Sequence, residues 1–353
     1  MPPNLINSYI YNTVFTCFVK GKYILLYNAK ILFLEPPLYS RYNILKEGGE
    51  LNRMFLTIDS GGSKTKLLLR TADGRWIAEQ DTEGFGTATD TDAVHPVLLG
   101  VLKIFCGGWS ISVVVCNLGG KNKEQITNTI RQVLPRAKIY VFRESEGLIG
   151  ITLCRNLHAQ VALLAGTGSI AIAPVENQAI IGGGWGANIG DKGSGYHIGL
   201  RAIADSLEQL DGTAPMSQLA QQITGLSSAP GIQSAAEYCA LRDEVRNRLK
   251  PLDRAHIATF AKTVSACAAQ NDPHALMLLR QAGLDLADLV LRTAAKTGNP
   301  LKCVVVTGGM VHAKQFWQEA FETSLREKHQ IEQIFYLPDG IQDALYTLAK
   351  TMI

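Results

Sequence analysis

Residues 59–66 read DSGGSKTK and follow directly on a short apolar strand signal at residues 55–59 (FLTID). A second strand signal comes next at residues 66–71 (KLLLRT), so the two glycines occupy a strand–strand corner. Glycine lets the backbone bend tightly there and turn its N–H groups toward an anion. The GxxxxGK[ST] pattern of a P-loop is absent, so the segment predicts either a phosphate-binding turn of another kind or a plain glycine hairpin.

The side chains of this corner suit a phosphate site. Ser63 and Thr65 add hydroxyl donors, and Lys64 adds positive charge. Asp59, at the strand end, is expected to hold Mg²⁺ directly or through water, because Mg²⁺ prefers carboxylate and water oxygens. The predicted phosphate contacts are Gly61, Gly62, Ser63 and Lys64.

The same pattern recurs later in the chain. Residues 159–164 (AQVALL) predict a strand, residues 165–169 (AGTGS) a turn, and residues 170–174 a second strand. Two strand–glycine turn–strand units indicate a duplicated domain, and together they favour phosphate binding over two plain hairpins. The second turn supplies the candidate contacts Gly166, Thr167, Gly168 and Ser169.

A third glycine-rich segment, residues 182–199, reads GGGWGANIGDKGSGYHIG. Because glycine costs conformational entropy on folding, such a density suits a backbone that approaches a ligand closely. Trp185 is expected to pack on a sugar face, and Asp191 to accept hydrogen bonds from sugar hydroxyls. A flexible surface loop is the alternative, and it leaves Trp185 unexplained.

The remaining signals predict an α/β protein. Strand and helix signals alternate between the two turns, which is typical of an α/β lobe. They lie at residues 111–116, 123–134, 138–142 and 144–154. After Gly199 the apolar spacing predicts helices at residues 201–210, 216–224, 234–249, 254–270 and 273–297. A last buried strand, residues 303–307, precedes helices at residues 313–328 and 341–352.

Length, charge and cysteine content limit the classes of protein to which this chain could belong. A chain of 353 residues suggests about two domains. The formal charge of +3 gives no argument for nucleic acid or a membrane surface as partner. Seven scattered cysteines without a CxxC pair argue against zinc or a disulfide framework, and they predict reduced, mostly buried thiols in the cytoplasm.

The first 53 residues differ from the rest. Residues 9–34 are apolar and aromatic, but Lys20, Lys22 and Lys30 interrupt them. No uninterrupted apolar run in this segment therefore reaches the roughly 20 residues that are needed to span a bilayer. Met54 opens a more regular pattern, and we interpret residues 1–53 as an appendage or an over-extended start.

Together, DSGGSKTK, GTGSIA and GGWGANIGDKGSGYHIG resemble the BadF/BadG/BcrA/BcrD ATPase family, which includes the N-acetylglucosamine and glucosamine kinases. The resemblance implies an α/β, two-lobed, actin-like (ribonuclease H-like) ATPase fold with a helix-rich second lobe. It implies ATP and Mg²⁺ in the cleft between the lobes, with an amino sugar beside the γ-phosphate. The lobes would be residues 54–155 and 156–339, with the terminal helix, residues 340–353, packing back on the first.

The resemblance also assigns residues. It makes Trp185, Gly186 and Asp191 sugar contacts, and it places the adenosine motif at Thr307, Gly308 and Gly309. The family's catalytic Asp corresponds to Glu144, so Glu144 is the candidate general base. The family's sugar-contacting Asn falls in residues 84–90 (GFGTATD), which lack Asn, and Thr87 is the expected substitute. Lys192 replaces a family Glu.

The implied function is ATP-dependent phosphorylation of an amino sugar by a cytoplasmic enzyme. A homodimer is a further expectation, because helix-rich second lobes often pair. Two alternatives stay open. One is an ATPase that activates a partner enzyme, as in relatives that hold an iron–sulfur cluster through interface cysteines, an arrangement that the seven cysteines do not show. The other is a catalytically degenerate regulator that binds nucleotide or sugar, which the change to Glu144 and the missing Asn motivate.

Overall fold

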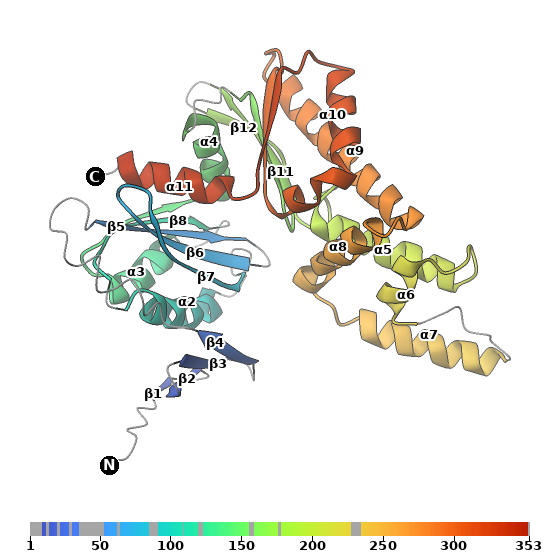
Figure 1. Ribbon diagram of the computed structural model, residues 1–353, viewed down its shortest axis with the longest axis horizontal. Coiled ribbons are helices and arrows are strands. Elements are labelled where there is room, and N and C mark those ends of the chain that lie inside the picture. Colours follow the sequence, from blue (N-terminus) through green and yellow to red (C-terminus); the bar gives the residue numbers. More distant parts are fainter. Residues whose placement is uncertain are drawn as a thin grey trace. The chain divides into compact units, whose positions relative to one another are not determined.

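The computed structural model describes residues 9–11, 14–19, 22–27, 30–34, 53–61, 64–84, 91–107, 109–118, 123–154, 159–175, 178–226 and 234–351. The chain divides into two compact units (Figure 1). The N-terminal unit consists of Met1–Arg143 with Leu345–Ile353, and the C-terminal unit is Glu144–Ala344. Each unit combines a five-stranded mixed sheet with helices, so the predicted α/β class is confirmed.

The sheet of the N-terminal unit has the order β7-β6-β5-β8-β9. Three strands form an antiparallel meander, β5 (Met54–Ser60), β6 (Lys64–Thr71) and β7 (Trp76–Glu83). The other two run parallel to β5, namely β8 (Ile111–Leu118) and β9 (Lys138–Phe142). The carboxyl ends of β5, β8 and β9 therefore share one edge of the sheet.

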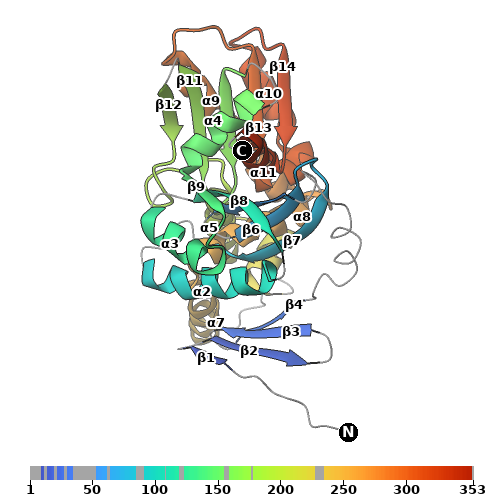
Figure 2. The same ribbon diagram turned by 90° about the vertical axis from the view of Figure 1, so that its left-hand side faces the viewer.

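Alternation along β5 sorts its side chains between the two faces of this sheet. Met54, Leu56 and Ile58 join the buried cluster with α2 (Thr91–Phe105) and α3 (Lys123–Val133), which cover one face (Figure 1, Figure 2). Phe55 points to the opposite face, where its ring centroid lies 5.9 Å from that of Tyr346. Successive strand residues alternate sides, so Asp59 lies on the face of Phe55, away from α2 and α3.

The C-terminal unit repeats this arrangement with the order β12-β11-β10-β13-β14. Its antiparallel strands are β10 (Val161–Ala165), β11 (Ser169–Val175) and β12 (Gln178–Gly183). Its parallel strands are β13 (Cys303–Thr307) and β14 (Gln333–Leu337). Both sheets share one strand order and one pattern of directions, as the repeated strand–turn–strand signal predicts.

Helices make up most of the C-terminal unit. They are α4 (Glu144–Cys154), α5 (Gly195–Leu210), α6 (Gln218–Thr224), α7 (Ala235–Leu249), α8 (Arg254–Ala268), α9 (Pro273–Ala295), α10 (Gln318–Arg326) and α11 (Gly340–Thr351), whose last part belongs to the N-terminal unit. The predicted lobe boundary at residue 155 lies after α4, whereas α4 packs on β10, β11 and β12 and so belongs to the C-terminal unit.

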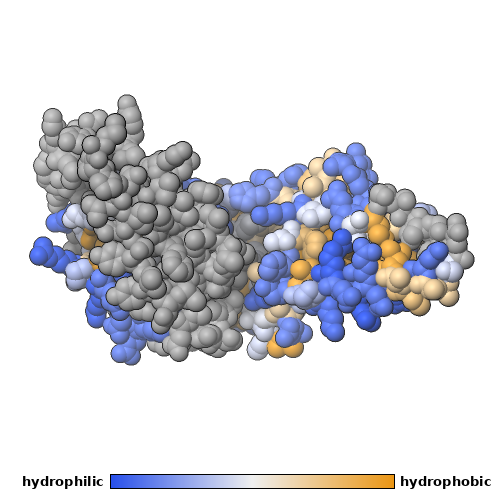
Figure 3. Space-filling model, turned by 90° about the horizontal axis from the view of Figure 1, so that it is seen from below, coloured by the Kyte–Doolittle hydropathy of each residue, from blue (hydrophilic) through white to orange (hydrophobic). Residues whose placement is uncertain are grey.

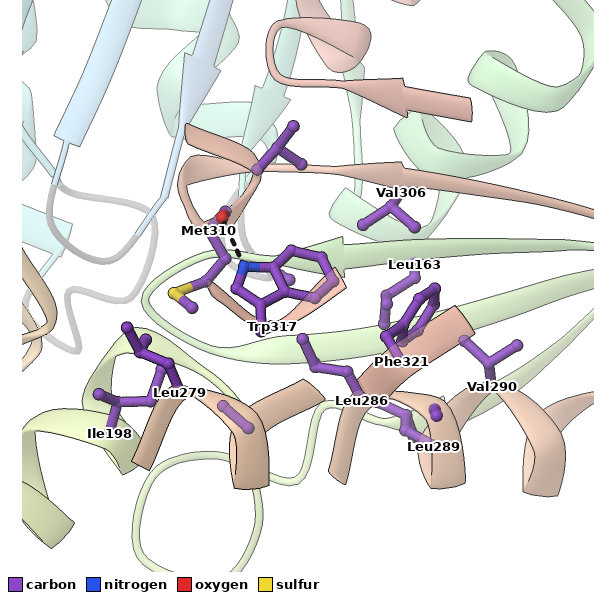
Figure 4. Close-up of a cluster of buried hydrophobic side chains, with 14 of the residues drawn as sticks. Leu163, Ile198, Leu279, Leu286, Leu289, Val290, Val306, Met310, Trp317 and Phe321 are labelled. Carbon is purple, nitrogen blue, oxygen red and sulfur yellow. Dashed lines mark hydrogen bonds between the residues drawn. The ribbon is translucent and has the colours of Figure 1, made fainter. Parts of the chain in front are cut away.

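Trp317 is the largest fully buried side chain of the C-terminal core. Its indole lies among Leu163, Leu286 and Phe321, which come from β10, α9 and α10 (Figure 4). Trp317 Nε1 donates a hydrogen bond to the carbonyl oxygen of Met310 at 3.0 Å. The core is therefore anchored where the strands, α9 and α10 meet.

The structure corrects several predicted elements. The predicted helix 313–328 is divided into the 3₁₀ helix η2 (Gly309–Phe316) and α10, because the backbone at Trp317 is not helical and its indole enters the core. Helix α5 begins at Gly195 rather than at residue 201, because the Ser194 side chain accepts a hydrogen bond from His197 N. Helix α2 and strand β14 were not predicted at all.

Part of the predicted appendage is described as four short strands, β1 (Tyr9–Tyr11), β2 (Val14–Val19), β3 (Lys22–Tyr27) and β4 (Lys30–Leu34). They form an antiparallel sheet in the order β1-β2-β3-β4, separate from the two other sheets. Among the described helices, none has the length and apolarity needed to cross a membrane. On the face drawn in Figure 3, hydrophilic and hydrophobic residues are interspersed over the coloured surface.

Replacing Trp317 tests the account of the C-terminal core. Trp317→Phe leaves a cavity and removes the donor to Met310 O, so we expect it to lower the free energy of unfolding by about 1–3 kcal/mol. Trp185, which is 74% exposed, provides the matched control. Trp185→Phe should leave the urea-unfolding midpoint unchanged, and an equal loss in both variants would contradict the assignment.

Candidate active site

The first glycine corner joins β5 to β6. Its turn is closed by a hydrogen bond from Gly61 N to Lys64 O at 2.9 Å. The predicted contacts Gly62 and Ser63 lie outside the described residues. Lys64 pairs with Asp81 at 2.6 Å, and both side chains are about half exposed. Such a surface pair contributes little stability, so it leaves Lys64 available to an anionic ligand.

Thr65 does not have the predicted role of ligand donor. It is fully buried, and its hydroxyl lies 2.7 Å from that of Ser60, which is also buried. The two hydroxyls satisfy each other across the corner, because an unpaired buried hydroxyl would be costly. Thr65 therefore stabilises the turn.

Asp59 lies at the shared edge of the parallel strands. Its register partner on β8 is Asn117, and Asn117 in turn pairs with Phe142 on β9. The amide Nδ2 of Asn117 donates to Asp59 Oδ1 at 2.8 Å. Beyond Phe142 the chain enters α4, whose first residue is Glu144. The side chain of Glu144 lies outside the description.

The donor set at Asp59 fits Mg²⁺. The ion is typically held by one or two carboxylates, with waters and substrate phosphates completing its shell. Asp59 supplies a carboxylate, and the Asn117 amide holds one of its oxygens by a hydrogen bond from Nδ2. Among the described residues no group of three His, Cys, Asp or Glu side chains could hold a metal alone.

The second glycine corner is bound to the first turn of α5. Gly195 N donates to Gly166 O at 2.8 Å, and Tyr196 N donates to Thr167 O at 3.2 Å. Within the corner, Gly166 N donates to Gly168 O at 2.9 Å. The first N–H groups of α5 thus hold the turn instead of an external anion, and they fix the direction of its peptide groups.

Asp191 lies against this corner. Its carboxylate is buried and pairs with Arg254 Nη2 at 2.8 Å. A Cβ added at Gly168 would lie 2.8 Å from Arg254 Nη2 and 2.9 Å from Asp191 Oδ2, so only glycine leaves room for this ion pair. Ser169, also buried, donates to the Lys192 carbonyl at 2.9 Å and joins the two segments. The structure thus brings Asp191 and the second turn together.

Most glycines of residues 182–199 face the protein itself. A Cβ at Gly182 would collide with Thr293, and one at Gly193 would lie 2.7 Å from Leu286, both on α9. A Cβ at Gly199 would collide with the backbone of Ile257 on α8. Close helix and strand packing therefore accounts for these glycines, and the prediction that the density reflects ligand approach needs correction.

Gly186 and the neighbouring Trp185 do not pack against the rest of the protein in this way. Gly186 has a φ of +92°, and a Cβ there would meet nothing within 4 Å. Trp185 and Ile189, on the same loop, are 74% and 78% exposed. Asp191 has a φ of +61°, a left-handed conformation that a non-glycine residue rarely adopts. The segment thus combines an exposed, apolar tip with a buried aspartate whose backbone is left-handed.

His197, in the first turn of α5, contacts the glycine-rich segment at Gly193. Burial lowers the pKa of its ring, against the raising effect of the Asp285 carboxylate. The neutral form lets Nδ1 accept a hydrogen bond from Gly193 N, at a donor–acceptor distance of 3.5 Å. This contact helps to fix the turn that precedes α5.

The predicted adenosine motif follows β13. Thr307 pairs with Leu164 on the neighbouring parallel strand β10, so the motif and the second glycine corner share one edge of the sheet. Thr307 is buried, whereas Gly309 is exposed. Gly308 has a φ of +102°, and a Cβ there would lie 2.6 Å from the Ala165 carbonyl oxygen. Gly308 therefore lets the chain turn away after β13, next to the second glycine corner.

The sequence interpretation missed two polar residues. Asn117 directly follows the strand predicted at residues 111–116, and Arg254 opens a helix far along the chain from Asp191. A polar side chain at the end of an apolar run was a usable signal for Asn117. Nothing local pointed to Arg254. Thr87, the expected sugar contact, lies outside the described residues.

The described cysteines fit the expectation of mostly buried thiols. Cys106, Cys116, Cys267 and Cys303 are buried, and Cys239 is exposed. Burial raises the pKa of Cys106 to about 12, so this thiol stays protonated. A protonated, buried thiol is a poor nucleophile and a poor metal ligand.

Two units with one strand order, each carrying a glycine corner between its first strands, define an α/β protein of the sugar-kinase and actin-like ATPase fold. The chain belongs to the BadF/BadG/BcrA/BcrD ATPase family, whose sequence profile matches residues 56–345. The predicted family is therefore confirmed.

Two characterised relatives are similar over most of their length. An N-acetylmuramic acid/N-acetylglucosamine kinase from Clostridium acetobutylicum is 24% identical over 283 residues, which cover 76% of this chain and 89% of the relative. A glucosamine kinase from Vibrio cholerae is 27% identical over 248 residues, which cover 66% of this chain and 77% of the relative.

Solved structures share the fold. A proposed N-acetylglucosamine kinase from Chromobacterium violaceum has a TM-score of 0.60 at 23% identity, covering 84% of this chain and 99% of the other. Another, from Porphyromonas gingivalis, has a TM-score of 0.62 at 17% identity, covering 83% and 99%. The predicted actin-like fold class is confirmed by these similarities.

The neighbouring glycines Gly308 and Gly309 provide a test of the backbone turn that follows β13. Gly308→Ala forces a side chain into a left-handed backbone and against Ala165 O, so we expect a loss of about 2 kcal/mol or more in unfolding free energy. Gly309→Ala meets nothing within 4 Å and should change it little. Chemical denaturation measures both, and equal stabilities would contradict the described turn.

Proposed function

We propose that this chain is an ATP-dependent kinase that phosphorylates a hydroxyl of an amino sugar such as N-acetylglucosamine or glucosamine. The observation that carries the proposal is the second glycine corner, where the buried Asp191 carboxylate lies against Gly168. A fixed carboxylate beside a phosphate-binding turn suits the meeting point of a sugar and a γ-phosphate. Both characterised relatives are named as kinases of amino sugars, and this supports the substrate class.

The phosphates of ATP would contact both glycine corners. In the first, Gly61, Gly62 and Ser63 would supply the turn, and Lys64 would exchange its surface partner Asp81 for a phosphate. In the second, the rigid attachment to α5 supports binding by residues 166–169. The adenosine would lie against residues 307–309, at the same sheet edge as the second corner.

Asp59 would hold Mg²⁺, with Asn117 beside it. Bound Mg²⁺ supplies charge neutralisation at the β- and γ-phosphate oxygens. Asp191 would accept hydrogen bonds from the sugar, while Trp185 and Gly186 would border the ring and Thr87 would add a hydroxyl. The exposure of Trp185 supports this role, because the tip of its loop is open to a ligand.

The chemical step transfers the γ-phosphoryl group to the sugar. The sugar oxygen forms a bond to phosphorus as the bond from phosphorus to the bridging oxygen of ADP breaks. Glu144 would accept the hydroxyl proton as general base. Because Glu carries one more methylene than the Asp of related kinases, its carboxylate must be accommodated by a small shift of the sugar or of α4.

An ATP-consumption assay against a panel of amino sugars tests the function. We expect turnover that depends on N-acetylglucosamine or glucosamine, with a no-sugar reaction as control. Turnover without sugar would instead indicate an ATPase that acts on a partner enzyme. Nucleotide binding without any turnover would indicate a regulator.

Variants of Glu144 test the base assignment in the same assay. Glu144→Gln keeps the size of the side chain but cannot accept the proton, so kcat should fall by about 10²-fold or more. Glu144→Asp retains a carboxylate and should retain measurable turnover. Unchanged kcat in Glu144→Gln would remove Glu144 from this role.

A further inference from the structure

The amide of Asn117, at the end of β8, lies beside Asp59, but its function there is still to be specified. We propose that Asn117 is the positioning residue of the magnesium–nucleotide site: it orients the Asp59 carboxylate and accepts a hydrogen bond from a water molecule bound to Mg²⁺. This inference rests on the proposed function, in which Asp59 holds the magnesium of Mg²⁺–ATP.

The sheet places the two side chains together. Asp59 and Asn117 are register partners on the parallel strands β5 and β8. Their neighbours Ile58, Cys116 and Leu118 belong to the core beneath α2 and α3. Because strand residues alternate sides, Asp59 and Asn117 both point to the opposite face. They also lie at the carboxyl end of their strands, the edge at which β5 gives way to the glycine corner.

The hydrogen bond restrains the carboxylate. Asn117 Nδ2 donates to Asp59 Oδ1 at 2.8 Å, and Asn117 itself is only 1% exposed. A buried, immobile donor fixes the rotation of the Asp59 carboxylate before a metal arrives. Partners of this kind are general for metal-binding carboxylates, and losing one typically lowers metal affinity about 10- to 100-fold.

The oxygen of the Asn117 amide, Oδ1, indicates that a ligand binds here. Asn117 Oδ1 is buried, and no hydrogen-bond donor within the described part of the chain reaches it. An unsatisfied buried acceptor costs about 1–3 kcal/mol. Magnesium keeps several of its waters when bound to proteins, and those waters are strong donors. A metal-bound water beside Asp59 would satisfy Oδ1.

Two other buried polar side chains of this unit, Thr129 and Thr57, behave differently. Thr129, on α3 and 1% exposed, donates to the backbone carbonyl of Gln125 at 2.9 Å. Thr57, on β5 and fully buried, donates to the backbone of Leu68 at 3.3 Å. These bonds serve the local backbone. Asn117 instead contacts the side chain proposed to bind metal and keeps an acceptor unused.

Calorimetric titration of ATP into the full-length protein, with Mg²⁺ and then with EDTA, tests the inference without using activity. Asn117→Leu has nearly the same shape but lacks both polar atoms. We expect it to bind ATP about 10-fold more weakly with Mg²⁺, and as wild type does with EDTA. Thr129→Val, which also loses one buried hydrogen bond, should match wild type under both conditions.

A second variant keeps the test decisive if Asn117→Leu does not fold. Asn117→Asp places a second carboxylate beside Asp59, and the two charges repel unless a cation lies between them. Magnesium should therefore raise the melting temperature of Asn117→Asp more than that of wild type. A residue with a purely structural role would lower stability without this added response to Mg²⁺.

The outcomes separate the two claims. If wild type shows no Mg²⁺-dependent ATP binding, the proposed function fails and the inference fails with it. If wild type binds Mg²⁺–ATP and Asn117→Leu binds it equally well, the inference alone is overturned. An equal magnesium response of Asn117→Asp and wild type would overturn it in the same way.

Discussion

Parallel pairing of strands is the constraint on which the rest of the structure depends. In each unit the first strand of an antiparallel meander also pairs in parallel with a later strand, β5 with β8 and β10 with β13. The carboxyl ends of such strands meet at one edge, so that each glycine corner shares its edge with the end of a distant segment. Asp59 thereby reaches Asn117, and Thr307 pairs with Leu164 just before the second corner begins.

Glycine serves two purposes in this molecule. At Gly308, with its positive φ, glycine permits a turn that a side chain would block, and at Gly168 it leaves room for the Asp191–Arg254 ion pair. In residues 182–199 it mainly permits close packing, since the missing Cβ atoms at Gly182, Gly193 and Gly199 would collide with α9 or α8. The dense glycine segment therefore positions Asp191 by packing tightly around it, and only its tip at Trp185 is open.

The sequence predicted much of the fold because its strands are continuous apolar runs that end at glycines. Strands β5, β8, β10 and β13 follow this rule, because a glycine comes directly after each of them. Helix α2 was missed because Pro96 interrupts its helical signal. The predicted helix 313–328 failed at Trp317, where burial of the indole among distant strands and helices outweighs local helix propensity.

The candidate site was predictable only where a motif carries it. The two corners and Asp191 stood out as glycine-rich segments, whereas Asn117 and Arg254 act through partners distant in sequence, Asp59 and Asp191. Such pairs follow from strand register and helix packing, which a single sequence does not encode locally. The position of the Glu144 carboxylate is likewise a question of tertiary structure.

Hydrogen–deuterium exchange on addition of Mg²⁺ and a non-hydrolysable ATP analogue tests the central claim most directly, namely that one nucleotide engages both glycine corners. The account predicts slower exchange at residues 59–66 and at residues 166–169, with the same dependence on analogue concentration. Protection of one corner alone, or of the two at clearly different concentrations, would contradict it.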